Sequence, residues 1–280
     1  MAARRRLDAE LVRRGLATSR EAARAEVLAG RVTVGGAPAT KPSRLVDPGE
    51  AIVVHGPPPR FVSRAGFKLV AAIERFGLGP SIDGARVLDA GASTGGFTDC
   101  VLQCGAAEVV ALDVGHNQLH ERLLVHPRVV SKERTNLRMV TPGSLGDPFD
   151  VVVADLSFIS LELVLDPLIA VAAAGALYVV LVKPQFEAGR TEVARGRGVI
   201  SDPVVWRGVL GSIASALTTR SAAIMGAMAS PLTGADGNVE FLLVGRFPSG
   251  PDDVAGWPAL VGDDLDRALD VAVDDAGGVH

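Results

Sequence analysis

Hydrophobic positions follow two alternating patterns through most of this chain. Segments with apolar residues three or four apart, typical of helices, alternate with short apolar runs bounded by glycine, proline or charge, typical of strands. The pattern predicts helices at 63–76, after Gly96, near 116–123, at 160–172 and at 203–218. It predicts strands at 86–90, 107–113, 128–131, 150–155, 177–183, 222–228 and 239–247. This alternation is typical of an α/β protein with a Rossmann-like parallel sheet covered by helices on both faces.

The first 60 residues predict a smaller α/β unit. Leu7, Leu11 and Val12 have helical spacing, and Thr18-Ser19-Arg20-Glu21 is a capping box before a second helix that Gly30 ends. Two short strands follow at 31–34 and 51–54. Prolines at 57–59 indicate a stiff connector. We therefore expect a small domain at 1–56, a linker at 57–62, a larger domain at 63–248 and an acidic extension at 249–280.

Composition indicates a soluble, core-forming protein of 280 residues with 48% hydrophobic and 21% charged residues. The longest uncharged apolar run, 168–182, contains Gly175 and is shorter than the roughly 20 residues of a spanning helix. The N-terminus lacks the apolar core of a secretory signal, so we expect a cytoplasmic protein. We separately expect a monomer. Cys100 and Cys104 have no matching pair, and the five histidines show no ligand spacing, so no metal is expected.

Charge is unevenly distributed along the chain. Residues 1–60 carry eleven Lys and Arg against six Asp and Glu, whereas residues 251–280 carry one Arg against eight Asp. A basic module in a mildly acidic protein indicates a phosphate-rich partner such as RNA. The alternative is a solvated basic face without a partner.

A glycine-rich turn, Leu88-Asp-Ala-Gly91-Ala-Ser-Thr-Gly95-Gly96-Phe97, follows the first strand of the larger domain and opens a helix. Its spacing is not that of a dinucleotide site, and the chain has no phosphate-binding G-x-x-x-x-G-K-[ST] loop. Asp113 ends the next strand, where an acid can accept hydrogen bonds from ribose hydroxyls. The combination favours S-adenosylmethionine as cofactor; the alternative is a tight turn and a surface aspartate.

Four charged residues flank this turn. Asp155 and Lys183 end two neighbouring apolar strands, and Glu240 stands at the start of the last strand. Ligands of such sheets bind at the carboxyl ends of the strands, so Asp155 and Lys183 are candidates for the site. Lys68 lies on the helix before the first strand, where spacing alone is equally compatible with a surface lysine.

These motifs carry a resemblance to a known family. The stretch from Arg6 to Val34 resembles the S4 RNA-binding module, and L-D-A-G-A-S-T-G-G-F, A-D-L-S-F-I and V-K-P-Q-F-E resemble the FtsJ class of ribose methyltransferases. The whole arrangement resembles the TlyA family, known both as hemolysin A and as ribosomal RNA cytidine-2'-O-methyltransferases. Two departures from the resemblance are the order of small residues in Ser63-Arg-Ala-Gly-Phe-Lys68 and the acidic extension.

The resemblance implies roles for particular residues. It implies a catalytic tetrad of Lys68, Asp155, Lys183 and Glu240. It implies cofactor contacts at Gly91, Gly95, Gly96, Asp113 and Asn136, to which we add Asp89, Ser93 and Phe97 of the same turn. It implies contacts to ribosomal RNA at Arg6, Arg13, Arg14, Arg20 and Arg24, to which we add Arg60 and Arg64 at the domain junction.

A 2'-O-methylation agrees chemically with the tetrad. A ribose hydroxyl must lose its proton as it attacks the sulfonium methyl, and a buried lysine beside a second cation is favoured in the neutral form that can take it. Asp155 would orient the amine, and Glu240 would pair with Lys68. Two alternatives stay open: an RNA base methyltransferase, although Asp155-Leu-Ser-Phe158 differs from the N/D-P-P-Y/F motif, and a membrane-active cytolysin, although 168–182 reads as core.

Overall fold

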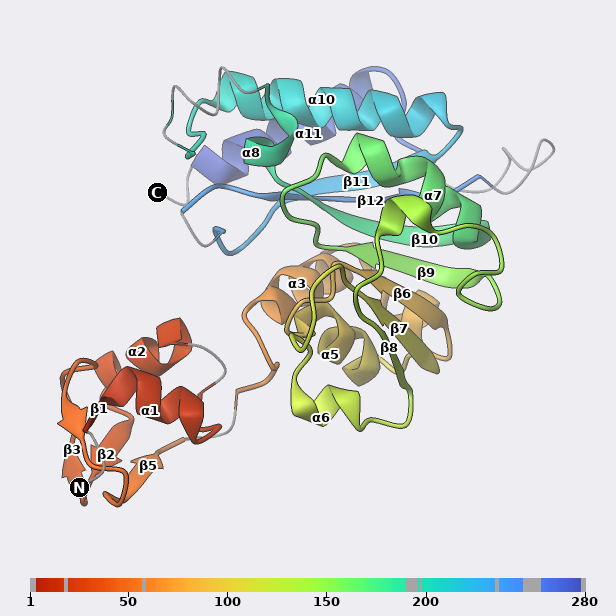
Figure 1. Ribbon diagram of the computed structural model, residues 1–280. Helices are drawn as coiled ribbons and strands as arrows, with labels where there is room; N and C mark the ends of the chain where they lie inside the picture. The colour runs from red at the N-terminus through yellow and green to blue at the C-terminus, as the bar shows by residue number, and fades with distance from the viewer. Residues whose placement is uncertain are drawn as a thin grey trace. The chain divides into compact units, whose positions relative to one another are not determined.

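A computed structural model describes residues 4–17, 20–56, 59–189, 196, 198–234, 237–248 and 258–277. The chain divides into two compact units, residues 1–62 and 63–280 (Figure 1). Each unit has its own hydrophobic core, and each is described by itself below.

The N-terminal unit is a small α/β fold. Helices α1 and α2 pack against each other, β2 lies between β3 and β5 in an antiparallel sheet, and β1 pairs with β4. Leu7, Leu11 and Val27 from the helices meet Val32 and Val46 from the strands in the core. The predicted capping residues Thr18 and Ser19 lie outside the described residues. The bounds are β1 (Arg5–Arg6), α1 (Leu7–Arg13), α2 (Arg20–Leu28), β2 (Val32–Val34), β3 (Ala37–Pro38), β4 (Leu45–Val46) and β5 (Ile52–Val54).

The C-terminal unit alternates helices and strands. Its first half contains α3 (Ala65–Phe76), α4 (Gly79–Ile82), β6 (Arg86–Ala90), α5 (Gly96–Gln103), β7 (Glu108–Leu112), α6 (Glu121–Leu124), β8 (Val129–Lys132) and the 3-10 helix η1 (Leu137–Met139). Its second half contains β9 (Phe149–Ala154), η2 (Leu161–Val164), α7 (Leu165–Val171), β10 (Ala172–Val182), α8 (Pro184–Glu187), α10 (Pro203–Thr219), β11 (Ala223–Ala229), β12 (Phe241–Arg246) and α11 (Asp263–Gly277).

The seven strands form one sheet in the order β11-β12-β10-β9-β6-β7-β8, which confirms the predicted Rossmann-like α/β class. The expectation of a parallel sheet is wrong for one strand, because β12 runs antiparallel to both β10 and β11. The connections explain this difference. A helix carries the chain from β10 to β11, whereas the described part of the segment between β11 and β12 contains no helix, so the chain returns as a hairpin.

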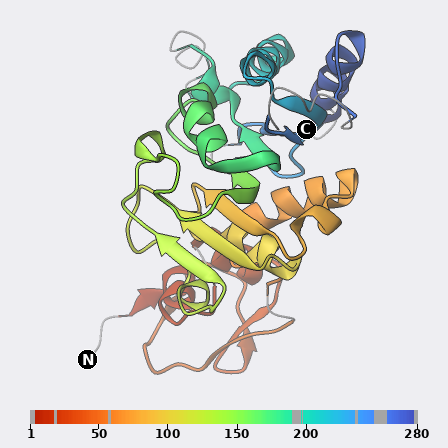
Figure 2. The ribbon, with the colours of Figure 1, turned by 90° about the vertical axis from the view of Figure 1, so that its right-hand side faces the viewer.

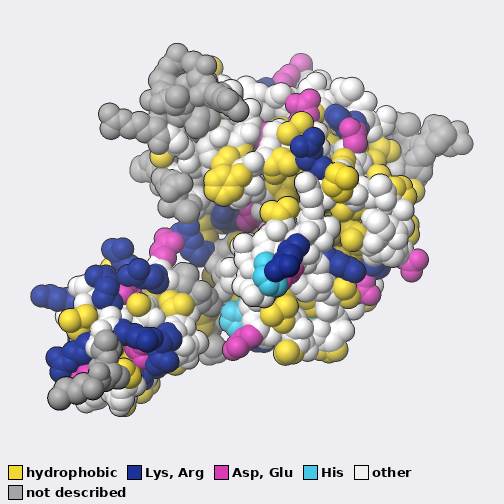
Figure 3. All heavy atoms as spheres, viewed as in Figure 1, with side chains coloured by type: hydrophobic (Ala, Val, Ile, Leu, Met, Phe, Trp, Pro, Cys, Tyr) yellow, Lys and Arg dark blue, Asp and Glu magenta, His cyan; other side chains and the backbone are white. Residues whose placement is uncertain are grey.

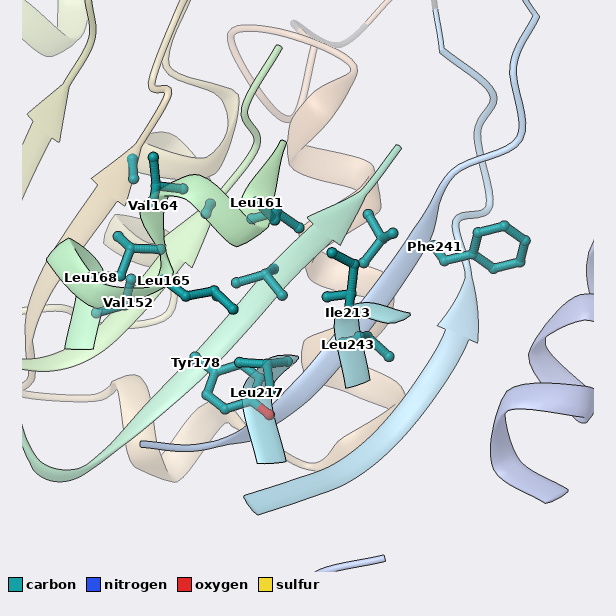
Figure 4. Close-up of a cluster of buried hydrophobic side chains, with 14 of the residues drawn as sticks. Val152, Leu161, Val164, Leu165, Leu168, Tyr178, Ile213, Leu217, Phe241 and Leu243 are labelled. Carbon is teal, nitrogen blue, oxygen red and sulfur yellow. The ribbon is translucent and has the colours of Figure 1, made fainter. Parts of the chain in front are cut away.

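Each strand of the sheet sends alternate side chains to opposite faces. On one face, Val152, Tyr178 and Leu243 pack with side chains from η2, α7 and α10, such as Leu161, Leu168, Ile213 and Leu217 (Figure 4). The opposite face is covered by α3 and α5, and a Cβ at Gly226 of β11 would meet the Phe76 ring of α3. Helices therefore cover both faces of the sheet (Figures 1 and 2).

Two segments differ in detail from the predicted pattern. The helix predicted near 116–123 is reduced to α6, because Asn117 adopts a left-handed backbone with φ of 54° and His120 is the residue that caps the helix. Within the predicted acidic extension, α11 packs on β11 and α10 through Leu269, Ala272 and Val273. Among the described residues, no helix is long and apolar enough to cross a membrane.

Candidate active site

The strand order places the glycine turn next to Asp155. Strand β6 lies between β7 and β9, and the chain leaves β6 toward β7, so the sheet has its switch point between β6 and β9. The Asp155 amide donates a hydrogen bond of 3.0 Å to the carbonyl of Ala90. A pocket opens at these strand ends and is lined by Ser63, Ala65, Gly91, Ala92, Ser93, Thr94, Phe97, Asp155, Ser157 and Lys183.

Lys183 lies immediately after β10, with only 9% of its side chain exposed. Its Nζ is 2.6 Å from Asp155 Oδ1 and donates a hydrogen bond of 2.9 Å to Ser157 Oγ. The amine therefore stands in the pocket between two acceptors that follow β9.

Lys68 and Glu240 form a second ion pair, in which Lys68 Nζ donates to Glu240 Oε2. Both side chains are buried, with exposed fractions of 8% and 3%. Lys68 is therefore not the surface lysine that its helical spacing also allowed. The antiparallel register pairs Val182 with Phe241, so Lys183 and Glu240 come next to each other at the ends of β10 and β12. The fold thus gathers all four residues of the predicted tetrad at one edge of the sheet, with Asp155 and Lys183 in the pocket lining.

The glycines of the turn are required by contacts inside the protein as well as by the pocket that the turn lines. A Cβ at Gly91, where φ is 84°, would lie 2.6 Å from the carbonyl oxygen of Asp155. A Cβ at Gly95 would meet Leu119 and Leu123, and one at Gly96 would meet Ser63. The space beside Gly95 and Gly96 is thus filled by protein, and any cofactor contact at these two residues is made by backbone atoms.

Asp113 is held against the turn. Its Oδ2 accepts a hydrogen bond of 2.8 Å from the Ser93 amide, and its Oδ1 accepts one of 2.7 Å from the Gly115 amide. Each carboxylate oxygen keeps a further lone pair, which suits a ribose hydroxyl. Neither Asp113 nor Asn136 is among the residues that line the pocket. Asn136 is exposed, and its amide oxygen accepts a hydrogen bond from the Arg138 amide at the start of η1.

Asp89 is fully buried on β6 beneath the turn. Thr98 donates a hydrogen bond of 2.6 Å to its Oδ2, whereas its Oδ1 has no hydrogen-bond partner among the described residues. Burial raises the pKa of Asp89 to about 7, and the Thr98 hydrogen bond only partly opposes this. Asp89 does not line the pocket, and its hydrogen bond ties β6 to Thr98 of α5, the helix that follows the turn.

Phe158 is a candidate that residue spacing did not reveal. Its ring is 91% exposed, its backbone is left-handed with φ of 63°, and it directly follows the pocket residue Ser157. The Phe186 ring lies 5.2 Å away between centroids, and Lys183 Nζ lies 5.9 Å from the Phe186 centroid. The available signal was the aromatic that follows each charged strand end, in Asp155-Leu-Ser-Phe158 and Lys183-Pro-Gln-Phe186.

The basic residues of the N-terminal unit surround two buried carboxylates. Asp8 pairs with Arg6 and Arg20, and Glu10 pairs with Arg13 and Arg14. Hydrogen bonds from Arg13 and Arg14 lower the pKa of Glu10 to about 2. Lys and Arg side chains crowd the visible surface of this unit (Figure 3).

Arg14 differs from the other arginines. Only 21% of its side chain is exposed, and its guanidinium also donates to the carbonyls of Glu50 and Pro48. It thus ties α1 to the turn before β5 and has few donors left for RNA. The side chains of Arg6, Arg13 and Arg20 are 46%, 48% and 60% exposed, and Arg24, Arg60 and Arg64 are exposed.

Comparison with known proteins identifies the family. A family model described as FtsJ-like methyltransferase matches residues 61–247, and an S4 domain model matches residues 5–52. The chain is 49% identical over 244 residues to the 16S/23S rRNA (cytidine-2'-O)-methyltransferase TlyA of Mycobacterium tuberculosis, covering 87% of this chain and 90% of that protein. The chain belongs to the TlyA family of FtsJ-like methyltransferases.

Other TlyA relatives carry different names. Hemolysin A of Brachyspira hyodysenteriae is 39% identical and is covered over 98% of its length by 85% of this chain. A solved structure from Streptococcus thermophilus, assigned by name to the hemolysins, superposes with a TM-score of 0.73 at 35% identity, covering 99% of this chain and 98% of that one. The sequence resemblance to the TlyA family is thereby confirmed, and the chain is an enzyme of the methyltransferase class.

Proposed function

We propose that this protein transfers a methyl group from S-adenosylmethionine to the 2'-hydroxyl of a cytidine in ribosomal RNA. The observation that carries the proposal is the buried Lys183 amine, held in the pocket by Asp155 and Ser157 next to the glycine turn. The name of the M. tuberculosis relative supports the ribosomal RNA target and the cytidine. A ribosomal target further supports a cytoplasmic site of action, and the proposed chemistry uses a single chain without a metal.

Lys183 is the proposed base. A ribose hydroxyl is a weak nucleophile until its proton is removed, and a neutral amine within hydrogen-bond reach can take that proton. Asp155 orients the amine through the 2.6 Å contact. Lys68 is paired with Glu240 at the adjoining strand end, next to the pair of Lys183 and Asp155. Positioning of the hydroxyl in line with the methyl group supplies the rest of the rate enhancement.

The pocket suits the proposed cofactor. Its wall between Gly91 and Thr94 has only small side chains, and Asp113 presents a carboxylate to the same turn. Bound S-adenosylmethionine would supply an electrophilic methyl group. We propose that backbone atoms of Gly91, Ser93, Gly95 and Gly96, the Phe97 ring and the Asp113 carboxylate hold it, with Asp89 supporting the turn and Asn136 at the margin.

Phe158 is the proposed platform for the target base. Phe158 is 91% exposed and has a left-handed backbone conformation, and strained residues of this kind cluster at ligand-binding sites. RNA-modifying enzymes commonly read splayed bases by stacking them on such rings. Stacking of the cytosine on Phe158 would leave the ribose near Ser157 and Lys183.

The N-terminal unit is the proposed RNA-docking module. Asp8 and Glu10 orient guanidinium groups whose outer faces stay exposed, which suits contacts to phosphates. We assign this role to Arg6, Arg13, Arg20 and Arg24, with Arg60 and Arg64 at the junction. Arg14 is assigned to the unit's own stability.

The test is mass spectrometry of ribosomal RNA from cells with and without the gene, for 16S and 23S molecules separately. We expect a 2'-O-methylcytidine to disappear in the deletion strain and to return when the wild-type chain, but not Lys183→Ala, is supplied. A methyl group lost from a base instead of a ribose would identify a base methyltransferase. Unchanged RNA together with lysis of red cells by the purified protein would support the hemolysin reading.

A further inference from the structure

The direction of the Lys183 amine is set by one short segment. Asp155 and Ser157, the two acceptors that contact Lys183 Nζ, belong to residues 155–160, which we call the acceptor arm. A neutral amine has two N–H groups and one lone pair. The hydrogen bond to Ser157 holds one N–H group, and the Asp155 carboxylate 2.6 Å away limits how the amine can turn about that bond, so the direction of the lone pair is restricted.

The acceptor arm has no regular secondary structure between β9 and η2. Its near end continues from β9, where the Asp155 amide is bonded to Ala90. Ser157 and Phe158 are exposed, and only Leu156 and Ile159 pack against the apolar core. An arm of this kind needs a further attachment to hold Ser157 to a fraction of an ångström, because small displacements of a reacting group are costly in rate.

Glu187 provides that attachment. Its Oε2 accepts a hydrogen bond of 2.6 Å from Ser160 Oγ, and its Oε1 accepts one of 2.8 Å from the Leu161 amide. Both oxygens of the carboxylate thus bind the far end of the arm. Burial raises the pKa of Glu187, because it disfavours the charged carboxylate. Keeping this carboxylate buried therefore costs free energy of folding.

Glu187 also stands on the segment that carries the base. It is the last residue of α8, and Lys183 is the residue that precedes this helical turn. One rigid turn therefore joins the Lys183 backbone to the arm that holds the Lys183 amine. The V-K-P-Q-F-E motif contains both ends of this connection, and the tetrad chemistry uses only its lysine.

We propose that Glu187 is a positioning residue for methyl transfer, which clamps the acceptor arm so that Ser157 and Asp155 together aim the Lys183 amine at the substrate hydroxyl. This inference rests on the proposed function for its reaction and on the hydrogen bonds above for its geometry. Ser157 acts as the contact between the clamp and the amine.

The test compares Ser157→Ala, Glu187→Ala, Glu187→Gln and the double variant Ser157→Ala with Glu187→Ala. We expect each alanine variant to lower the single-turnover methylation rate between about tenfold and about hundredfold. The affinity for S-adenosylmethionine, measured by calorimetry, should stay within about twofold of the wild-type value, because these variants change the position of the base and not the contacts to the cofactor. Glu187→Gln should keep most of the rate, because its amide can accept from Leu161 and donate to Ser160. Glu162→Ala, an exposed glutamate on η2, is the matched control.

Two readouts separate positioning from mere stability. The double variant should lose no more rate than the slower single variant, because both changes release the same amine. Hydrogen exchange of the Leu161 amide should be faster in Glu187→Ala than in wild type and unchanged in Glu187→Gln. This measurement does not depend on methyl transfer. Additive losses, unchanged rates, or unchanged Leu161 exchange would overturn the clamp. A wild-type chain that transfers no methyl group would refute the proposed function, while the exchange result would still decide whether Glu187 holds the arm.

Discussion

At the scale of single residues, the site depends on buried charges held in pairs. Lys183 with Asp155, and Lys68 with Glu240, each neutralise a charge that would be costly to bury alone. Removing one partner leaves the other unpaired, so charge-deleting variants must be judged against stability. A variant that keeps the volume of the side chain is the cleaner probe.

Lys183→Met keeps the length of the side chain and removes the proposed base. We expect methyl transfer to fall by about 10² to 10⁴, the usual contribution of general base catalysis, with cofactor affinity nearly intact. Single-turnover assays and calorimetry measure the two quantities, and Lys132→Met is the control, because the Lys132 side chain is exposed and is not part of the pocket lining. A wild-type rate in Lys183→Met would show that Lys183 is not the general base.

Asp89 predicts a pH dependence of stability. Its pKa of about 7 in the fold lies above the ordinary carboxyl value, so the native state binds the extra proton and loses stability as pH rises through this range. Asp89→Asn should therefore gain stability relative to wild type between about pH 5 and pH 7, by up to about 1.4 kcal/mol per pH unit. Urea unfolding at several pH values measures the difference, and a pH-independent difference would contradict a neutral Asp89.

Phe158→Ala should weaken RNA-dependent catalysis without changing cofactor affinity. Loss of one stacked base costs about 1 to 3 kcal/mol, and relief of the left-handed backbone strain offsets none of it, because alanine is strained there too. Phe158→Trp should restore activity, since any aromatic ring can stack. Equal rates for the alanine, tryptophan and wild-type chains would exclude the stacking role.

At the scale of elements, the glycine turn serves packing and site together. Gly95, with φ of 97°, begins α5, and a Cβ there would lie 2.2 Å from Leu123. A substitution therefore strains both the backbone and the contact with α6. Loss of cofactor affinity at this position would accompany loss of fold stability.

Gly95→Ala should lower the free energy of unfolding by about 2 to 5 kcal/mol, the sum of backbone strain and overpacking. Gly143→Ala is the matched control, because Gly143 has a positive φ of 76° and nothing within 4 Å of its added Cβ. The difference between the two variants isolates the steric part. Equal destabilisation would show that Leu123 moves aside without cost.

At the scale of the whole molecule, charge divides the work between a basic N-terminal unit and a methyltransferase unit whose last helix is acidic. Helix α11 places Asp266 and Asp270 on Arg207 and leaves further aspartates exposed. A negative surface repels RNA phosphates. The salt dependence of RNA binding should therefore come from the N-terminal arginines.

Arg13→Ala and Arg20→Ala should each weaken RNA binding several-fold and lower the slope of log K against log salt by about one. Arg14→Ala should instead lower the stability of the N-terminal unit, because it loses hydrogen bonds to Glu10, Glu50 and Pro48. A chain lacking residues 1–58 should still bind cofactor. Filter-binding measurements of RNA affinity at several salt concentrations test this prediction. Equal slopes of log K against log salt for the truncated and full chains would show that the arginines do not contact RNA phosphates.

Apolar periodicity and glycine placement act over a few neighbouring residues, so the sequence predicts the α/β class and the seven strands of the large sheet. In the N-terminal unit it predicts β2 and β5 but misses the two-residue strands β1, β3 and β4. It also located Asp155 and Lys183 at strand ends, since a charge that ends an apolar run is visible in one dimension. The family resemblance added Lys68 and Glu240, whose partnership spans 172 residues of chain.

Features that depend on distant neighbours become visible only when the elements are packed together. The antiparallel direction of β12 is set by its pairing with β10 and β11. The crowding at Gly95 comes from Leu119 and Leu123, which follow it by more than 20 residues. The exposure of Phe158 depends on how the surrounding elements pack. The double attachment of the acceptor arm likewise joins Ser160 and Leu161 to Glu187 across two strand ends. Such contacts are set by the packing of whole elements, because local periodicity fixes which face a residue occupies and not what that face meets.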